Sequence, residues 1–115
     1  MKRKEFGVAG EKLAKNYLES VGLNVVSNNY YSRYGEIDII CEDKNNRIFV
    51  EVKSRSSGAK SRLESITEKK QKKIINTMLK YEEINFSNKQ PRFDVIEVIF
   101  DLHGIPAINH ISNAF

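Results

Sequence analysis

The sequence predicts an α/β fold in which a mixed central sheet is flanked by helices, in the order α-β-β-β-α-β. Three observations predict it: two segments repeat apolar residues at helical spacing, two β-rich runs are separated by a short turn, and a further β-rich run follows the second helical segment. The chain has 115 residues, of which 40% are hydrophobic. This is enough material for one core, so we expect a single domain over residues 1–115.

The first helix is expected from about Lys4 to Val21, with Gly22 as its C-cap. Glu11 falls at the edge of the apolar arc, half turned toward the core. The apolar residues that recur at helical spacing are Phe6, Ala9, Leu13, Ala14, Tyr17, Leu18 and Val21.

The strands are predicted from β-rich runs and turn residues. A first strand at 23–26 leads into a polar, aromatic connection at 28–32. Two runs, 35–41 and 47–53, then form a hairpin around the turn residues 43–46.

A second helix is predicted over about 65–84, after which Phe93 to Phe100 forms a fourth strand. Residues 107–111 are an optional fifth strand, and the two prolines, Pro91 and Pro106, mark short connections. The apolar arc of the helix contains Ile66, Ile74, Ile75, Met78, Leu79 and Tyr81.

The formal net charge of +4 is unevenly distributed. Residues 53–73 hold eight basic and two acidic side chains, residues 1–15 hold five and two, and the rest of the chain is acidic. Two basic blocks on an acidic background suit a surface that binds a polyanion such as nucleic acid. Lysine-rich helix surfaces that serve solubility are the equally weighted alternative.

Several classes of protein are excluded by what the sequence lacks. A single cysteine, Cys41, rules out an internal disulfide framework and a multi-cysteine zinc site, and we expect it to pack in the core. No apolar stretch reaches the length of a membrane span, and charged residues follow the basic N-terminus where a signal peptide needs an apolar run. We therefore expect a soluble, cytoplasmic protein with no membrane partner. His103 and His110 lack metal-site spacing and are interpreted as surface or turn residues.

Asp38 and Glu51 each interrupt an apolar run of the hairpin. Side chains alternate along a strand, so Asp38 shares a face with Glu36, and Glu51 shares one with Lys53. A four-residue loop at 43–46 places Asp38 opposite Glu51. A two-residue turn at Asn45-Asn46 instead places Asp38 opposite Lys53, and both registers keep the charged group on one side.

Opposed carboxylates repel each other unless a cation lies between them. Hard oxygen ligands of this kind favour Mg²⁺ or Mn²⁺. Lys53 is then suited to orient or help deprotonate an attacking water, and Glu11 to supply a further acidic contact. A cross-strand ladder of salt bridges is the structural alternative.

Five short motifs stand out in this sequence: Gly10-Glu11, Gly35-Glu36-Ile37-Asp38, Phe49-Val50-Glu51-Val52-Lys53-Ser54-Arg55, Arg92-Phe93-Asp94-Val95 and Asn113-Ala114-Phe115. In combination they resemble the YraN family of uncharacterised bacterial proteins, over nearly the whole chain. That family resembles the archaeal Holliday junction resolvases within the PD-(D/E)XK nuclease superfamily. The resemblance implies a restriction-endonuclease-like core in which Asp38 and Glu51 hold the metal, Lys53 serves the water and Glu11 is the acid of the first helix. The superfamily's proline before the aspartate is Ile37 here.

The nucleic-acid contacts are expected from three places: a basic loop after Lys53, the polar face of the second helix, and an aromatic segment before the hairpin. Each place has a structural alternative. The loop is then simply solvated, the Gln71 side chain is hydrogen-bonded to backbone, and the tyrosines pack against the rest of the protein. The candidate residues are Arg33 beside Tyr30, Tyr31 and Tyr34, then Arg55, Lys60, Arg62, Lys69, Lys70, Gln71 and Lys73. Asp94 is expected to have a structural role, as a cap or as a partner of Arg92.

The leading functional hypothesis is a Mg²⁺- or Mn²⁺-dependent endonuclease that hydrolyses phosphodiester bonds in DNA, with branched or structured DNA as the favoured substrate. The alternative is a non-catalytic nucleic-acid-binding module, or an accessory subunit, that keeps the nuclease fold. The resemblance to resolvases also allows a homodimer, because two strands of a junction need two sites.

Overall fold

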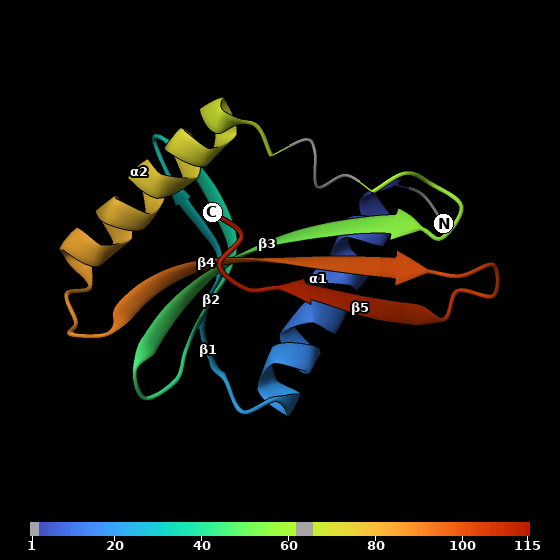
Figure 1. Cartoon of the computed structure of the whole chain (residues 1–115), viewed down its shortest axis with the longest axis horizontal. Coiled ribbons are helices and arrows are strands. Elements are labelled where there is room, and N and C mark those ends of the chain that lie inside the picture. Colours follow the sequence, from blue (N-terminus) through green and yellow to red (C-terminus); the bar gives the residue numbers. More distant parts are fainter. Residues whose placement is uncertain (1–2, 62–65) are drawn as a thin grey trace.

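The computed structural model describes residues 3–61 and 66–115, and its element order is α-β-β-β-α-β-β. The elements are α1 (Arg3–Ser20), β1 (Asn24–Ser32), β2 (Gly35–Glu42), β3 (Asn46–Ser56), α2 (Glu68–Ile84), β4 (Gln90–Phe100) and β5 (Pro106–Ile111). The strands form one mixed sheet in the order β1-β2-β3-β4-β5, in which only the β3–β4 pair is parallel. Figure 1 shows the sheet between its two helices. This confirms the predicted α/β class and is consistent with a restriction-endonuclease-like core.

Helix α1 covers one face of the sheet. Ala14 and Leu18 are fully buried in a core with residues of β2, β3 and β4, as the predicted apolar arc required. The helix ends in a Schellman motif, in which the Leu23 N–H donates to the Leu18 carbonyl and the Gly22 N–H to the Glu19 carbonyl. Gly22 takes φ +93°, a conformation that glycine adopts without strain, which confirms it as the C-cap residue.

Helix α2 covers the other face, where Ile74, Met78 and Tyr81 pack with Phe49 and neighbouring strand residues. The helix starts later than predicted, at Glu68, because the Thr67 side chain caps it by accepting a hydrogen bond from the Lys70 N–H at 3.3 Å. The predicted apolar arc was too wide, since Ile75 and Leu79 are exposed.

Two predicted strand boundaries were wrong. The polar segment 28–32 is not a connection but the second half of β1, paired with β2. A register shift between Val25 and Ser27 and a left-handed Asn29 (φ +54°) let this asparagine-rich stretch follow the sheet. Similarly, the expected basic loop starts later than predicted, since β3 stays paired with β4 as far as Ser56 and the turn begins at Ser57. The optional fifth strand is present as β5.

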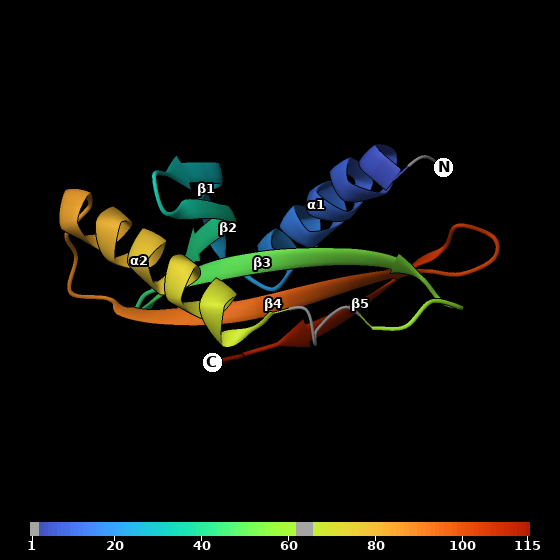
Figure 2. The same cartoon turned by 90° about the horizontal axis from the view of Figure 1, so that it is seen from above.

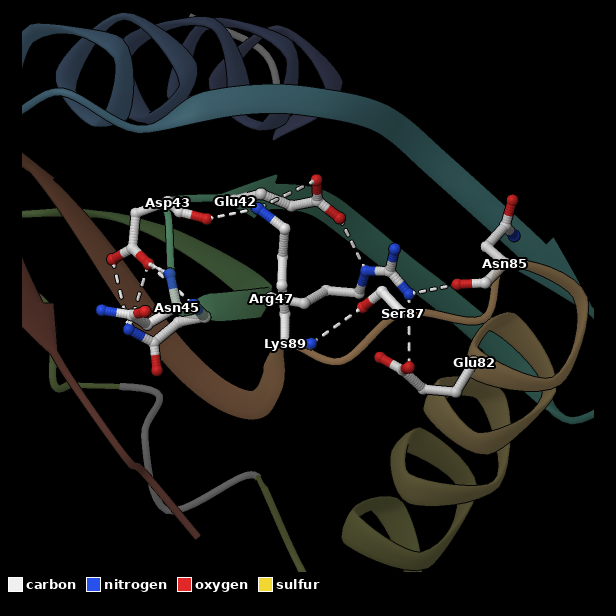
Figure 3. A network of polar contacts seen from close by, with 9 residues as sticks. Glu42, Asp43, Asn45, Arg47, Glu82, Asn85, Ser87 and Lys89 are labelled. Carbon is white, nitrogen blue, oxygen red and sulfur yellow. Dashed lines mark hydrogen bonds and ion pairs between the residues drawn. The ribbon is translucent and has the colours of Figure 1, made fainter.

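A buried arginine ties the hairpin to the end of α2 (Figure 3). Arg47, on β3, donates to the Glu42 carboxylate at 2.7 Å, to the Glu82 carboxylate at 3.2 Å and to the Asn85 carbonyl at 2.5 Å. Its guanidinium also lies over the Tyr81 ring, 5.1 Å from the centroid. The network fixes the C-terminal end of α2 against the β2–β3 hairpin, and with it the course of the helix along the sheet.

Gly10 lets α1 approach β3 closely. A Cβ atom at Gly10 would lie 1.8 Å from Ser54 Oγ and 3.1 Å from Ser54 Cβ. We therefore expect Gly10→Ala to destabilise the protein by about 1 kcal/mol, although alanine is the better helix former. In a Ser54→Gly background the same substitution should instead stabilise by up to about 1 kcal/mol, because the clash is gone. Urea unfolding of the four proteins measures both terms, and equal effects in the two backgrounds would contradict the contact.

Candidate functional site

The candidate site lies where β2 and β3 separate. Their ladder pairs Glu42 with Arg47 and ends at Ile39 opposite Val50. From there β2 continues with β1, while β3 continues with β4. Figure 2 shows the β1–β2 ribbon rising out of the plane of β3 and β4. Asp38 and Glu51 are the next residues on the two strands, in the register that the four-residue loop predicted.

Asp38 is held at the point of separation by the backbone of the opposite strand. Its Oδ2 accepts a hydrogen bond from the Val52 N–H at 2.8 Å, and the residue is only 7% exposed. Burial, and then the charge of Glu51, raise the pKa of Asp38 to about 8. The carboxylate is thus kept in a position where its ionised form is disfavoured in the metal-free protein.

Glu51 and Lys53 project from the same face of β3. Lys53 Nζ lies 3.6 Å from Glu51 Oε1, and their side chains are 15% and 20% exposed. Burial raises the pKa of Glu51, while the nearby Lys53 ammonium opposes that shift. The Lys53 ammonium therefore pairs with Glu51, and the buried Asp38 has no ion pair with it.

Glu11, on helix α1, is a third acidic residue near Asp38. Burial, followed by the charge of Glu36, raises the pKa of Glu11, while side-chain hydrogen bonds with Asn29 and Asp38 lower it. Glu11 is half-buried, as its place at the edge of the apolar arc predicted.

Sequence reasoning missed Asn29 as a site residue. Asn29 is bracketed by the ladder pairs Asn28–Ile39 and Tyr30–Ile37, which places it beside Asp38. Its side chain hydrogen-bonds to Glu11, and its backbone is left-handed. The signal in the sequence was the Asn28-Asn29 pair, which was interpreted as part of a connection, and asparagine tolerates a left-handed backbone better than most residues do.

The carboxylates of Asp38 and Glu51 could supply two ligands to a hard divalent cation, but not its whole coordination shell. Among the side chains that the structure describes, those of residues 7–61 and 66–115, no three from histidine, cysteine, aspartate or glutamate form a group that could hold a metal ion. Mg²⁺, however, commonly binds through one or two carboxylates and fills its shell with water and substrate phosphate. Asp38 and Glu51 offer such a pair, and the burial that raises both pKa values would be offset by a cation.

A pocket of about 190 Å³ opens beside the pair and runs to the N-terminal half of α2. Of the predicted nucleic-acid contacts, Lys70 and Lys73 line this pocket with Glu51 and Lys53. Tyr34 closes the end of the pocket next to the β1–β2 turn. The pocket thus brings one carboxyl group, that of Glu51, together with the ammonium groups of Lys53, Lys70 and Lys73.

The other predicted contacts lie elsewhere. Arg55 is engaged by the buried Glu97 at 3.0 Å and by the Ala59 carbonyl at 2.9 Å. Gln71 donates to the Ile66 carbonyl at 3.2 Å and lines a neighbouring pocket. The remaining candidates are Arg33, Lys60 and Lys69, which are exposed, and Arg62, which lies outside the described residues.

The expectation for His110 was wrong, while that for Asp94 is confirmed. His110 lies on β5, where its ring joins the Tyr17 hydroxyl at 2.9 Å to Asp94 Oδ2 at 2.7 Å. Asp94 is fully buried and also accepts two hydrogen bonds from the Arg92 guanidinium, both at 2.9 Å. Cys41 is buried, as expected, and His103 lies in an exposed turn.

Comparison with known proteins gives a family without an assigned activity. The model of the uncharacterised protein family UPF0102 matches residues 10–98. A UPF0102 protein of Clostridioides difficile (strain 630) is 48% identical, and the match covers both chains fully. A relative from Sulfurihydrogenibium sp. (strain YO3AOP1) is 46% identical, covering 100% of this chain and 97% of its own.

In the part of the chain that the structure describes, no helix is long and apolar enough to cross a membrane.

Proposed function

This chain belongs to the uncharacterised protein family UPF0102, which is the YraN family, and we propose that it is a metal-dependent endonuclease that hydrolyses phosphodiester bonds in DNA. The observation that carries the proposal is the buried pair Asp38 and Glu51, with Lys53 beside it, at the separation of two strands. A structural ion pair does not need two mostly buried acids for one ammonium.

In this proposal Asp38 and Glu51 hold a Mg²⁺ or Mn²⁺ ion, and Glu11 contributes a further negative charge from α1. The bound ion supplies positive charge to the phosphoryl oxygens and makes the attacking water more acidic. Lys53 orients that water and neutralises charge that develops on the phosphate. Lys70 and Lys73, at the rim of the pocket, attract and position the DNA backbone.

The test is cleavage of branched, single-stranded and linear duplex DNA by the purified protein in Mg²⁺ or Mn²⁺, with Asp38→Ala and Lys53→Ala variants in parallel. We expect cleavage by the wild type alone. Cleavage that persists in both variants would place the active site elsewhere. Metal-independent DNA binding without cleavage of any substrate would support the non-catalytic module instead.

Asn29 should act as a positioning residue for Glu11. At φ +54° glycine fits without strain, so Asn29→Gly removes the amide and leaves the backbone conformation allowed. We expect the free energy of unfolding to change little and cleavage to fall by about 10- to 100-fold, as for residues that orient metal ligands.

Asn113→Gly is the matched control, because Asn113 has nearly the same φ (+51°), does not line the pocket of the site, and donates its N–H to Asp94. Its cleavage should match that of the wild type. Isothermal titration with Mn²⁺ gives a second readout, and an Asn29→Gly protein with unchanged Mn²⁺ affinity and unchanged cleavage would remove Asn29 from the site.

A further inference from the structure

We propose that the groove between the β1–β2 turn and the second half of α2 binds an unpaired segment of the DNA strand, next to the point of cleavage. The inference rests on the proposed function and names the class of substrate. The groove has a volume of about 450 Å³. It is lined chiefly by Tyr30, Tyr31, Arg33, Tyr34, Lys80 and Ile84.

The walls of the groove are held by contacts between the two elements. The Ser32 hydroxyl donates to the buried Thr77 hydroxyl of α2 at 3.3 Å and accepts from the Tyr34 N–H at 3.0 Å. Tyr30 packs edge-on against Tyr81, with ring centroids 5.0 Å apart. Because the groove is formed before any ligand arrives, little ordering of the protein opposes binding.

Two tyrosine rings are available for stacking. Tyr31 is 69% exposed and Tyr34 is 36% exposed, although both line the groove. Exposed aromatic rings in a groove with cations are the usual platform for unpaired bases, and every base can stack on them. The bases of a continuous duplex are stacked on each other and cannot reach such a ring, so the groove fits a single strand.

The charges of the groove suit phosphates. Arg33 lies over the Tyr34 ring and donates to its hydroxyl at 2.7 Å, which holds the guanidinium at the groove. Lys80 lies 3.8 Å from the exposed Glu83, a weak pair that a phosphate can replace. Among the described residues that line the groove, none is acidic.

The groove adjoins the candidate active site, because Tyr34 lines both the groove and the pocket that holds Glu51 and Lys53. A strand that stacks its bases in the groove therefore presents its next phosphates to the pocket. The geometry points to DNA with a single-stranded segment, such as a fork, a flap or an opened branch, rather than to blunt duplex.

The test is binding of labelled single-stranded, forked and blunt duplex DNA, measured by fluorescence anisotropy in EDTA. We expect Tyr31→Leu and Tyr34→Leu each to weaken binding of single-stranded and forked DNA by about 5- to 150-fold, and to leave duplex binding unchanged. Tyr31→Phe keeps the ring and should bind within about two-fold of the wild type. Phe86→Leu removes an aromatic ring that is 85% exposed but does not line the groove, and should bind as the wild type does.

The salt dependence separates stacking from phosphate contact. Arg33→Gln should lower the slope of log affinity against log salt by about 0.7 on single strands, while Tyr31→Leu should leave that slope unchanged. Should Tyr34→Leu fail to fold, Tyr31→Leu carries the test, because its ring is mostly in solvent.

Wild-type affinity for single strands in both leucine variants would overturn the inference. Since binding is measured without divalent metal, the two proposals can fail separately. Tyrosine-dependent binding with no cleavage under any condition overturns the endonuclease alone, whereas cleavage with tyrosine-independent binding overturns the groove alone.

Discussion

Asp38→Asn should abolish cleavage and, in the same protein, raise its stability. The asparagine can still accept the hydrogen bond from the Val52 N–H, which spans 2.8 Å in the wild type. It cannot supply a charged ligand, so we expect cleavage to fall by a factor of the order of 10³. Residues that serve a reaction at the expense of the fold show this combination, and structural residues do not.

The gain in stability follows from the raised pKa of Asp38. An acid whose folded pKa lies above its ordinary value of 3.8 binds its proton more tightly in the folded state. Its contribution to stability is therefore full below pH 3.8 and is lost as the pH rises through about 8. Each unit of pKa shift corresponds to about 1.4 kcal/mol. Because Glu51 can take the proton instead, the gain in stability should be smaller than the full pKa shift implies. We expect Asp38→Asn to raise the free energy of unfolding by about 3 kcal/mol at pH 8.

Urea unfolding in EDTA at several pH values between 4 and 8 measures this effect. Added Mg²⁺ should stabilise the wild type and so reduce the difference in stability between the wild type and Asp38→Asn. Asp43→Asn is a control of opposite sign, because hydrogen bonds from the Asn45 and Asn46 N–H groups lower the pKa of Asp43. That substitution should destabilise the protein, and more so at pH 8 than at pH 4. An Asp38→Asn protein that is less stable than the wild type at pH 8 would identify Asp38 as part of a structural ion pair.

The sequence narrowed the register of the hairpin to two alternatives, and the structure forms the one with the four-residue loop, which local chemistry explains. Asp43 accepts hydrogen bonds from the two following asparagine N–H groups and so fixes a four-residue loop. Alternation along β2 and β3 then decides which side chains face each other. Asp38 and Glu51 are therefore the residues that follow the last pair, Ile39 and Val50, while the two-residue turn that would have paired Asp38 with Lys53 is not formed.

Features that depend on partners distant in the sequence could not be predicted. Arg55 looked available for phosphate until the fold placed Glu97 beside it. His110 looked like a surface residue because Tyr17 and Asp94, its partners, come from α1 and β4. Asn28 and Asn29 are poor strand formers, and only their pairing with β2 makes that segment a strand.

Lys53→Met should separate the chemical step from the binding of metal. Lys53 Nζ lies 3.6 Å from Glu51 Oε1, so the ammonium competes with a cation for that carboxylate. We expect cleavage to fall by a factor of the order of 10³, because both the orientation of the water and the neutralisation of developing charge are lost. The affinity for Mn²⁺, measured by calorimetry, should stay the same or rise.

Two further variants make the Lys53 experiment specific. Lys44→Met removes an exposed lysine from the β2–β3 turn, away from the pocket, and should change neither cleavage nor Mn²⁺ affinity. Lys53→Arg keeps the charge but cannot accept a proton near neutral pH. If Lys53 helps to deprotonate the water, the arginine variant stays as inactive as Lys53→Met, whereas a role as a positive charge alone predicts partial recovery of cleavage. Equal losses of cleavage and of Mn²⁺ binding in Lys53→Met would instead mean that the substitution disrupts Glu51, and would remove Lys53 from the chemistry.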